Sequence, residues 1–114
     1  MSSKYVLTDF QHLRDEMVRK QLINRDISSS KVLEAMSAVP REQFLPLEMR
    51  GFAYEDSPLP IAEGQTISQP YIVALMIDAL NLQGGERVLE IGVGSGYASA
   101  VLAEIADQVI GIER

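Results

Sequence analysis

Hydrophobic positions recur at helical spacing in the first part of the 114-residue chain. Between residues 9 and 40, apolar residues lie about three or four positions apart with charged residues between them, which predicts amphipathic helices. Serines 28–30 can cap a second helix in this region, and Pro40 ends it. The apolar positions are Phe10, Leu13, Met17, Leu22, Ile23, Val32, Leu33 and Met36.

All five prolines fall between residues 40 and 70, together with Gly51 and Gly64. Proline interrupts helix interiors and central strands, so this punctuation excludes a long regular element. The same stretch holds large apolar residues such as Phe44 and Tyr54 and is too hydrophobic for a disordered linker. We therefore expect an ordered loop that packs over another part of the molecule.

The last third of the chain predicts alternating helices and strands. Residues 70–82 are apolar on almost every side, which predicts a buried helix ended by Gly84–Gly85. The runs RVLEI (87–91) and QVIGIE (108–113) predict short buried strands, and residues 96–106 between them predict a second helix. Strand, glycine turn, helix and strand form a βαβ unit, which implies a parallel sheet with a right-handed crossover.

Composition excludes several classes of protein. Ten basic and 16 acidic residues give a net charge of −6, which argues against non-specific nucleic-acid binding. The chain has no cysteine and one histidine, His12, so no disulfide framework and no metal site is expected. The longest apolar stretch, residues 71–80, is interrupted by Asp78 and is too short to span a bilayer. Because the N-terminus has no signal-peptide pattern, we expect a cytoplasmic protein without membrane partners.

A glycine-rich turn after the first predicted strand carries the clearest candidate chemistry. Gly92, Gly94 and Gly96 allow the chain to turn sharply and let its backbone approach a ligand. The following helix directs free N–H groups and the positive end of its dipole at that ligand. Glu113 lies 21 positions after Gly92, close to the spacing of about 20 for an acid that binds ribose hydroxyls.

Two residues discriminate between nucleotide cofactors. The dinucleotide fingerprint requires Gly or Ala at its sixth position, where this sequence has Tyr97. Glu90 precedes the turn, and its carboxylate would repel a pyrophosphate but suits a cofactor with a cationic amino group, such as S-adenosylmethionine. An acid-x-Gly-x-Gly-x-Gly turn followed by a ribose acid is typical of class I methyltransferases. A nicotinamide-dependent oxidoreductase is the competing class, and titration with each cofactor separates the two.

A second motif, GQTISQPY at residues 64–71, joins the proline-rich loop to the buried helix. Ser68 and Gln69 at the start of a helix are typical of side-chain caps. The same helix N-terminus can instead hold a carboxylate on its free N–H groups. Spacing alone leaves both interpretations open.

Together these segments resemble the protein-L-isoaspartate O-methyltransferase family. The resemblance runs from about residue 9 to the last residue, through VLEAMSAVPREQFLP, AYEDSPLPIAEGQTISQPYIVALM and RVLEIGVGSGYASAVLAEIA in that order. The GQTISQPY block is more specific than the glycine turn, because methyltransferases in general lack it. The resemblance implies methyl transfer from S-adenosyl-L-methionine to the free α-carboxylate of L-isoaspartyl residues in damaged proteins and peptides. The ester then collapses to a succinimide, which reopens partly to aspartate.

The resemblance also implies roles for individual residues. Ser68 matches the family's active-site serine, which we expect to donate a hydrogen bond that orients the substrate carboxylate. That carboxylate is already ionised at neutral pH and needs no general base, so catalysis should come mostly from alignment and exclusion of water. The residues that match the cofactor site are Gln65, Thr66, Ile67, Glu90, Gly92, Gly94, Gly96 and Glu113.

The expected fold class is α/β, with an N-terminal helical segment followed by the first βαβ unit of a doubly wound, Rossmann-like methyltransferase sheet. Residues 1–69 should form the helices and the active-site loop, and residues 70–114 the start of the cofactor-binding part, within one structural domain. Two parallel strands cannot bury both faces of such a sheet, and Arg114 directly follows the second strand. We therefore expect an incomplete unit that binds the cofactor weakly and is nearly inactive alone. A catalytically inactive, methyltransferase-like nucleotide-binding fragment is the alternative, and a monomer is expected for the full-length enzyme.

Overall fold

The computed structural model describes residues 8–113, and the first part of this range is helical as predicted. The Asp9 side chain caps the first helix, and the Ser29 hydroxyl caps the second by accepting a hydrogen bond from the Val32 amide. The predicted serine cap is therefore confirmed. The elements of this region are α1 (Phe10–Met17), η2 (Val18–Leu22), η3 (Ile23–Arg25) and α2 (Ser30–Ala38).

The proline-rich segment is ordered, as expected, and ends in a short hairpin. Strand β1 (Leu59–Pro60) pairs antiparallel with β2 (Thr66–Ile67), and Leu59 lies opposite Ile67. Both of these side chains are buried, so the hairpin packs on the rest of the protein. The sequence did not indicate the hairpin, because Pro60 within so short a run argues against a strand. The remaining elements of the segment are η4 (Arg41–Phe44), η5 (Leu47–Phe52) and η6 (Ala62–Gly64).

Helix α3 (Pro70–Leu80) begins at the predicted proline but ends earlier than predicted. Asn81 adopts the left-handed conformation, with φ of 52°, and its amide donates to the Asp78 carbonyl at 3.1 Å. A left-handed residue at this position stops a helix. The expectation that Gly84–Gly85 ends the helix is therefore wrong, because Asn81 provides the left-handed cap first.

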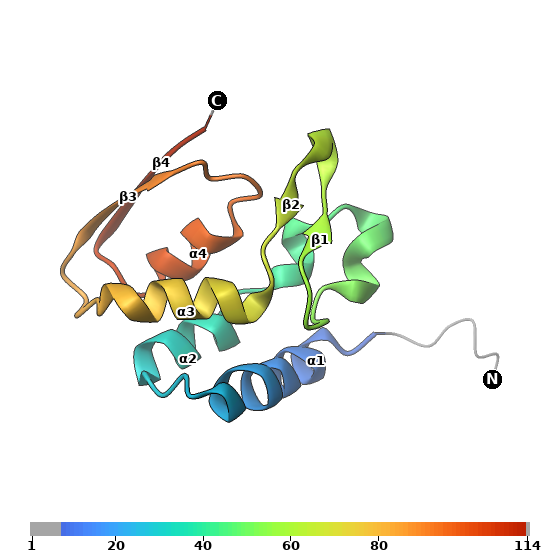
Figure 1. Ribbon diagram of the computed structural model, residues 1–114, viewed down its shortest axis with the longest axis horizontal. Coiled ribbons are helices and arrows are strands. Elements are labelled where there is room, and N and C mark those ends of the chain that lie inside the picture. Colours follow the sequence, from blue (N-terminus) through green and yellow to red (C-terminus); the bar gives the residue numbers. More distant parts are fainter. Residues whose placement is uncertain (1–7, 114) are drawn as a thin grey trace.

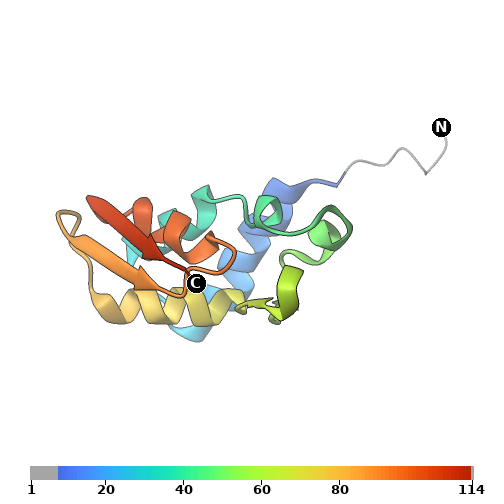
Figure 2. The same ribbon diagram turned by 90° about the horizontal axis from the view of Figure 1, so that it is seen from above.

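The predicted βαβ unit is confirmed. Strands β3 (Arg87–Ile91) and β4 (Gln108–Ile112) pair in parallel, and α4 (Tyr97–Ala103) connects them. Helices α2, α3 and α4 lie on one side of the two-stranded ribbon, and the β1–β2 hairpin lies near the N-terminal end of α3 (Figures 1 and 2). Strand β3 therefore ends near the point where the hairpin leads into α3. This arrangement brings the glycine turn and the GQTISQPY motif together.

Only one face of the β3–β4 sheet is covered within residues 8–113. Val88 and Val109 face the helices and pack against the core. The alternate side chains on the other face are 45–77% exposed, namely those of Leu89, Ile91, Ile110 and Ile112. The prediction of fully buried strands is therefore wrong for this face, and the prediction of a fully buried α3 is wrong at Met76, which is 66% exposed. The physical reason is that the described residues supply a single layer of helices.

A continuous hydrophobic core joins the helical region to the βαβ unit. Met17, Leu22 and Met36 from the first part meet Ala74 and Val101 from the second, and each of these five side chains is almost fully buried. The two parts of the chain therefore share one core. Among residues 8–113, the helices all fall short of the length and apolar character needed to cross a membrane.

Candidate functional site

The two sequence motifs line one cleft of about 120 Å³. The segment 66–68 approaches from the hairpin, and the end of β3 and the glycine turn approach from the sheet. The start of α4 completes the lining. The lining residues are Thr66, Ile67, Ser68, Glu90, Gly92, Val93, Gly94, Ser95, Tyr97 and Ala98. Six of the nine residues that the sequence assigned to the site therefore lie together in this cleft.

The glycine turn requires glycine at three positions. Gly92, Gly94 and Gly96 have φ angles of 77°, 60° and 88°, which lie in the left-handed region that other residues rarely adopt. The Gly92 amide donates to the Ile112 carbonyl at 2.8 Å and ties the turn to the end of β4. Added Cβ atoms on Gly92 and Gly94 would meet no heavy atom within 4 Å, so the backbone there borders open space.

Glu90 is held on the inner side of the sheet, below the turn. Its carboxylate accepts a hydrogen bond from the Ser99 hydroxyl in the first turns of α4. Directly across the ladder from Glu90 is Gly111. A Cβ atom on Gly111 would lie well inside the contact distance of the Val93 side chain. The glycine at 111 therefore provides the room in which Val93 and Ser99 pack beside Glu90.

Glu113 reaches the turn from the end of the second strand. Its carboxylate accepts a hydrogen bond from the Gly94 amide at 2.5 Å. Glu90 and Glu113 therefore place two carboxylates at one glycine turn, at the carboxyl ends of two adjacent parallel strands. Ligands of open parallel sheets bind at this end of the strands.

Ser68 and Gln69 do not cap helix α3 with their side chains. Gln69 occupies the N-cap position but makes no side-chain capping bond. Its amide instead donates to Asp56 at 2.6 Å. Ser68 lines the cleft, and its hydroxyl has no hydrogen-bond partner within residues 8–113. The capping interpretation of these two residues is therefore wrong, and the Ser68 hydroxyl is available to a ligand.

Gln65 and Gly96 lie beside the cleft and do not line it. Gln65 belongs to the hairpin, where its carbonyl accepts from the Ile61 amide at 2.8 Å and its side chain is exposed. Gly96 precedes α4, and a Cβ atom there would lie 3.9 Å from the Phe44 ring. Glycine is required there for the backbone conformation, whereas the space beside Phe44 would accept a Cβ atom in ordinary van der Waals contact.

Tyr97 also lines the cleft, although in the sequence it served only as an argument against the dinucleotide fingerprint. It borders the cleft, is 1% exposed, and packs edge-on against Phe44. The fully buried Arg41 guanidinium lies 4.9 Å from the centre of its ring. Burial raises the pKa of Tyr97 to about 12, so its phenol stays protonated at neutral pH. The ring anchors the start of α4. In the sequence, the only indication of this role was a large aromatic residue directly after the glycine turn.

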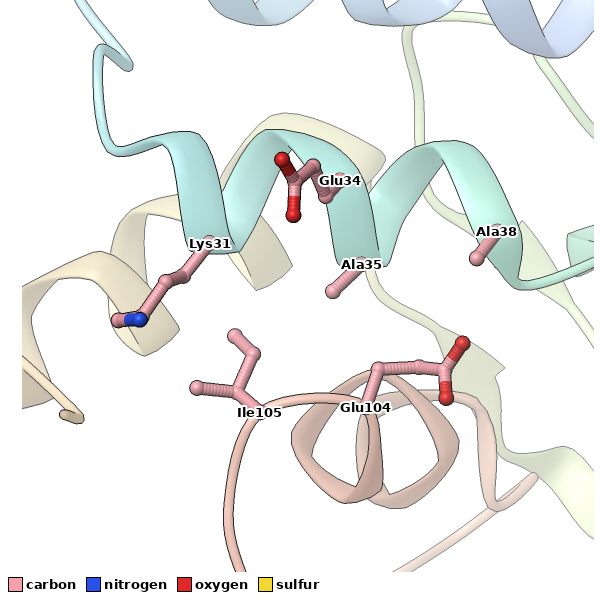
Figure 3. Close-up of a pocket in the computed structure, with 6 residues that line it drawn as sticks. All are labelled: Lys31, Glu34, Ala35, Ala38, Glu104 and Ile105. Carbon is pink, nitrogen blue, oxygen red and sulfur yellow. The ribbon is translucent and has the colours of Figure 1, made fainter. Parts of the chain in front are cut away.

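A second groove lies between α2 and α4, away from both motifs (Figure 3). Its surface charges are of mixed sign, and the carboxylates of Glu34 and Glu104 do not converge on a common point. The groove is lined by Lys31, Glu34, Ala35, Ala38, Glu104 and Ile105. We therefore assign the candidate site to the cleft at the glycine turn.

A parallel βαβ unit with a left-handed glycine turn, and with carboxylates at the ends of both strands, defines a Rossmann-like nucleotide-binding unit of the methyltransferase type. Residues 12–114 match the family model for protein-L-isoaspartate(D-aspartate) O-methyltransferase (PCMT). The chain therefore belongs to the protein-L-isoaspartate O-methyltransferase family.

Individual relatives and solved structures agree with this assignment. Protein-L-isoaspartate O-methyltransferase 1 of Rhodopseudomonas palustris (strain HaA2) is 64% identical over 107 residues, covering 94% of this chain and 44% of the relative. Protein-L-isoaspartate O-methyltransferase 2 of Marinobacter nauticus is 63% identical, covering 93% of this chain and 48% of the relative. The chain thus spans about half the length of the curated relatives it matches.

A crystal structure from Plasmodium falciparum provides the most informative structural comparison. It is described as a putative protein-L-isoaspartate O-methyltransferase in complex with S-adenosyl-L-homocysteine. The TM-score is 0.72 at 30% identity, and the match covers 95% of this chain and 50% of that one. A second solved protein-L-isoaspartate O-methyltransferase gives a TM-score of 0.73 at 32% identity, over 88% of this chain and 33% of that one. The α/β arrangement described above is therefore the fold of this family over the matched region.

Proposed function

We propose that the chain carries the cofactor turn and the catalytic serine of a protein-repair methyltransferase. The reaction would transfer a methyl group from S-adenosyl-L-methionine to the free α-carboxylate of L-isoaspartyl residues in damaged proteins and peptides, with the cytoplasm as the location. The observation that carries this proposal is the single cleft that joins Ser68, whose hydroxyl has no partner within residues 8–113, to the glycine turn. Family membership and the S-adenosyl-L-homocysteine complex of the Plasmodium falciparum protein support the choice of cofactor.

The residues at the turn fit S-adenosyl-L-methionine. Open space beside Gly92 and Gly94 allows the ligand to approach the backbone. Glu90 provides a carboxylate for the cationic amino group, and Glu113 provides one for the ribose hydroxyls. When bound, the cofactor would supply a methyl group on a positively charged sulfur atom.

The contribution of the chain to chemistry would be alignment. The substrate carboxylate is ionised at neutral pH, so no residue of the cleft has to remove a proton from it. We propose that the Ser68 hydroxyl donates a hydrogen bond to one carboxylate oxygen and directs the other oxygen at the methyl group. The free N–H groups at the start of α3 favour a negative charge at the same place. Holding both reactants in line replaces general base catalysis.

The test compares wild type with Ser68→Ala for methyl transfer to an isoaspartyl peptide. The variant should lose on the order of 100-fold in kcat, as expected when one oriented hydrogen-bond donor is removed. Its affinity for S-adenosyl-L-homocysteine, measured by calorimetry, should stay within about twofold because the turn is untouched. Ser28→Ala, an exposed serine away from the cleft, is the matched control and should behave as wild type.

The assay should be run on the chain alone and with a polypeptide carrying the remaining half of the Rhodopseudomonas palustris relative, because the chain spans 44% of that protein. Transfer to the isoaspartyl peptide but not to its aspartyl counterpart supports the proposal. Equal losses of activity and cofactor affinity in Ser68→Ala would assign the serine a structural role. Binding of S-adenosyl-L-homocysteine without methyl transfer in either arrangement would instead identify a nucleotide-binding fragment.

A further inference from the structure

Asp56 connects three segments that are distant in sequence. Its carboxylate accepts hydrogen bonds from both terminal nitrogens of Arg25, one of them at 2.8 Å, and one from the Gln69 amide at 2.6 Å. Arg25 ends η3, Asp56 lies in the proline-rich loop, and Gln69 is the first residue before α3. The three side chains therefore form a bridge, the Arg25–Asp56–Gln69 bridge, from the N-terminal helices to the start of α3.

The Gln69 side chain takes part in this bridge and does not cap α3. A side chain at the N-cap position usually bonds to the free amides of its own helix. Gln69 makes no such bond, and its side chain extends away from the helix to Asp56. The neighbouring residue, Ser68, makes no side-chain bond within residues 8–113. The hydroxyl that borders the cleft thus depends on the backbone of its neighbours for its position.

A second contact supports the same attachment. The Arg25 guanidinium lies 5.5 Å from the centre of the Tyr71 ring, in the first turn of α3. Arg25 therefore contacts α3 through Tyr71 and, by way of Asp56, through Gln69. These contacts fall on either side of Pro70, whose ring already restricts the backbone. The Arg25 guanidinium and the Gln69 amide also hold the pKa of Asp56 below its usual range, so the carboxylate is ionised at neutral pH.

We propose that Asp56 is a positioning residue for Ser68, which it holds at the cleft through the Gln69 side chain. This inference rests on the proposed function only in so far as Ser68 orients a substrate carboxylate. Asp56 touches neither reactant in this arrangement. It fixes the backbone at residues 68–69, so that the serine hydroxyl meets the carboxylate without first losing conformational freedom. The bridge should therefore affect substrate binding and turnover and leave the glycine turn unchanged.

The test compares Asp56→Ala with Glu55→Ala, a matched control that removes a carboxylate from the adjacent exposed residue, whose side chain has no hydrogen bond within the described range. Amide hydrogen exchange at residues 73–75, where the α3 amides begin to donate within the helix (Val73 to the Gln69 carbonyl at 3.2 Å), should accelerate roughly fivefold or more in Asp56→Ala, the effect of losing charge-assisted but exposed hydrogen bonds. Exchange in β3 and β4 relative to the global free energy of unfolding, and the affinity for S-adenosyl-L-homocysteine, should match those of Glu55→Ala. Binding of an isoaspartyl peptide in the presence of saturating S-adenosyl-L-homocysteine should weaken by a similar factor.

Gln69→Leu provides an independent check on the route. It should reproduce the accelerated exchange. The double variant Asp56→Ala/Gln69→Leu should exchange no faster than either single variant, because all three variants remove the same hydrogen bond between Gln69 and Asp56. Equal exchange at 73–75 in Asp56→Ala and Glu55→Ala would overturn the inference, as would faster exchange with unchanged peptide affinity. If the wild-type chain binds no isoaspartyl peptide either alone or together with the polypeptide that carries the remaining half, the proposed function fails, while the exchange comparison still decides whether Asp56 fixes Ser68.

Discussion

Gly111 illustrates how one residue without a side chain shapes the cleft. Gly111 lies opposite Glu90 in the sheet, and the Val93 side chain fills the space that a side chain at residue 111 would need. An added methyl group would therefore collide with Val93. We predict that Gly111→Ala lowers the free energy of unfolding by about 1–3 kcal/mol, the usual cost of overpacking, and weakens binding of S-adenosyl-L-homocysteine. Thermal unfolding and calorimetry would measure the two effects.

The double variant Gly111→Ala/Val93→Ala should recover most of the lost stability and of the lost cofactor affinity, because it removes the Val93 methyl group with which the added Cβ atom collides. A double variant no better than Gly111→Ala would show that the cost lies in the backbone of β4. At this scale, sequence reasoning identified residues whose chemistry is unusual for their position, such as the glycines with positive φ and the acid near the carboxyl end of each strand. It missed Ser99 and gave Tyr97 no structural role, since their importance depends on what they touch across the sheet and core.

At the scale of the element, helix α3 shows where a pattern predicts well and where it does not. The apolar run and Pro70 correctly predicted the helix and its start, because these depend on local conformational preference. The end depends on one residue in the left-handed conformation, and Asn81 provides it before the glycines do. The β1–β2 hairpin was missed for the complementary reason: its pairing comes from tertiary packing of Leu59 and Ile67 and overrides the local effect of Pro60.

The left-handed cap predicts that glycine has opposite effects on stability at two nearby positions, harmless at residue 81 and destabilising at residue 79. Asn81→Ala should destabilise the protein by about 1 kcal/mol, because asparagine tolerates a φ of 52° through local hydrogen bonding of its short polar side chain and alanine does not. Asn81→Gly should lose nothing. Ala79→Gly, within the helix and exposed, should instead cost about 1 kcal/mol. Urea denaturation of the three variants would measure these differences, and a loss of stability in Asn81→Gly would contradict the assignment of the helix end.

At the scale of the whole molecule, the uncovered face of the sheet is the main departure from what the sequence predicted. Parallel sheets are normally buried on both faces. The apolar runs of β3 and β4 correctly predicted strands of that type, yet half of their side chains face outward in the described structure. Sequence alone indicates that these residues favour burial. Which element buries them is a property of the assembled fold, and among residues 8–113 the helices cover only the face bearing Val88 and Val109.

An exposed apolar face of this kind has a measurable consequence for the chain on its own. Contiguous apolar patches and strand edges promote association. We predict concentration-dependent self-association, detectable by sedimentation velocity, through the face that bears Ile91, which is 77% exposed. Ile91→Lys should raise the dissociation constant at least about tenfold, because a charge on this face must be desolvated on contact. Leu47→Lys, at a residue 76% exposed on η5, is the matched control and should associate as wild type does. Equal association of all three proteins would place the contact away from the sheet.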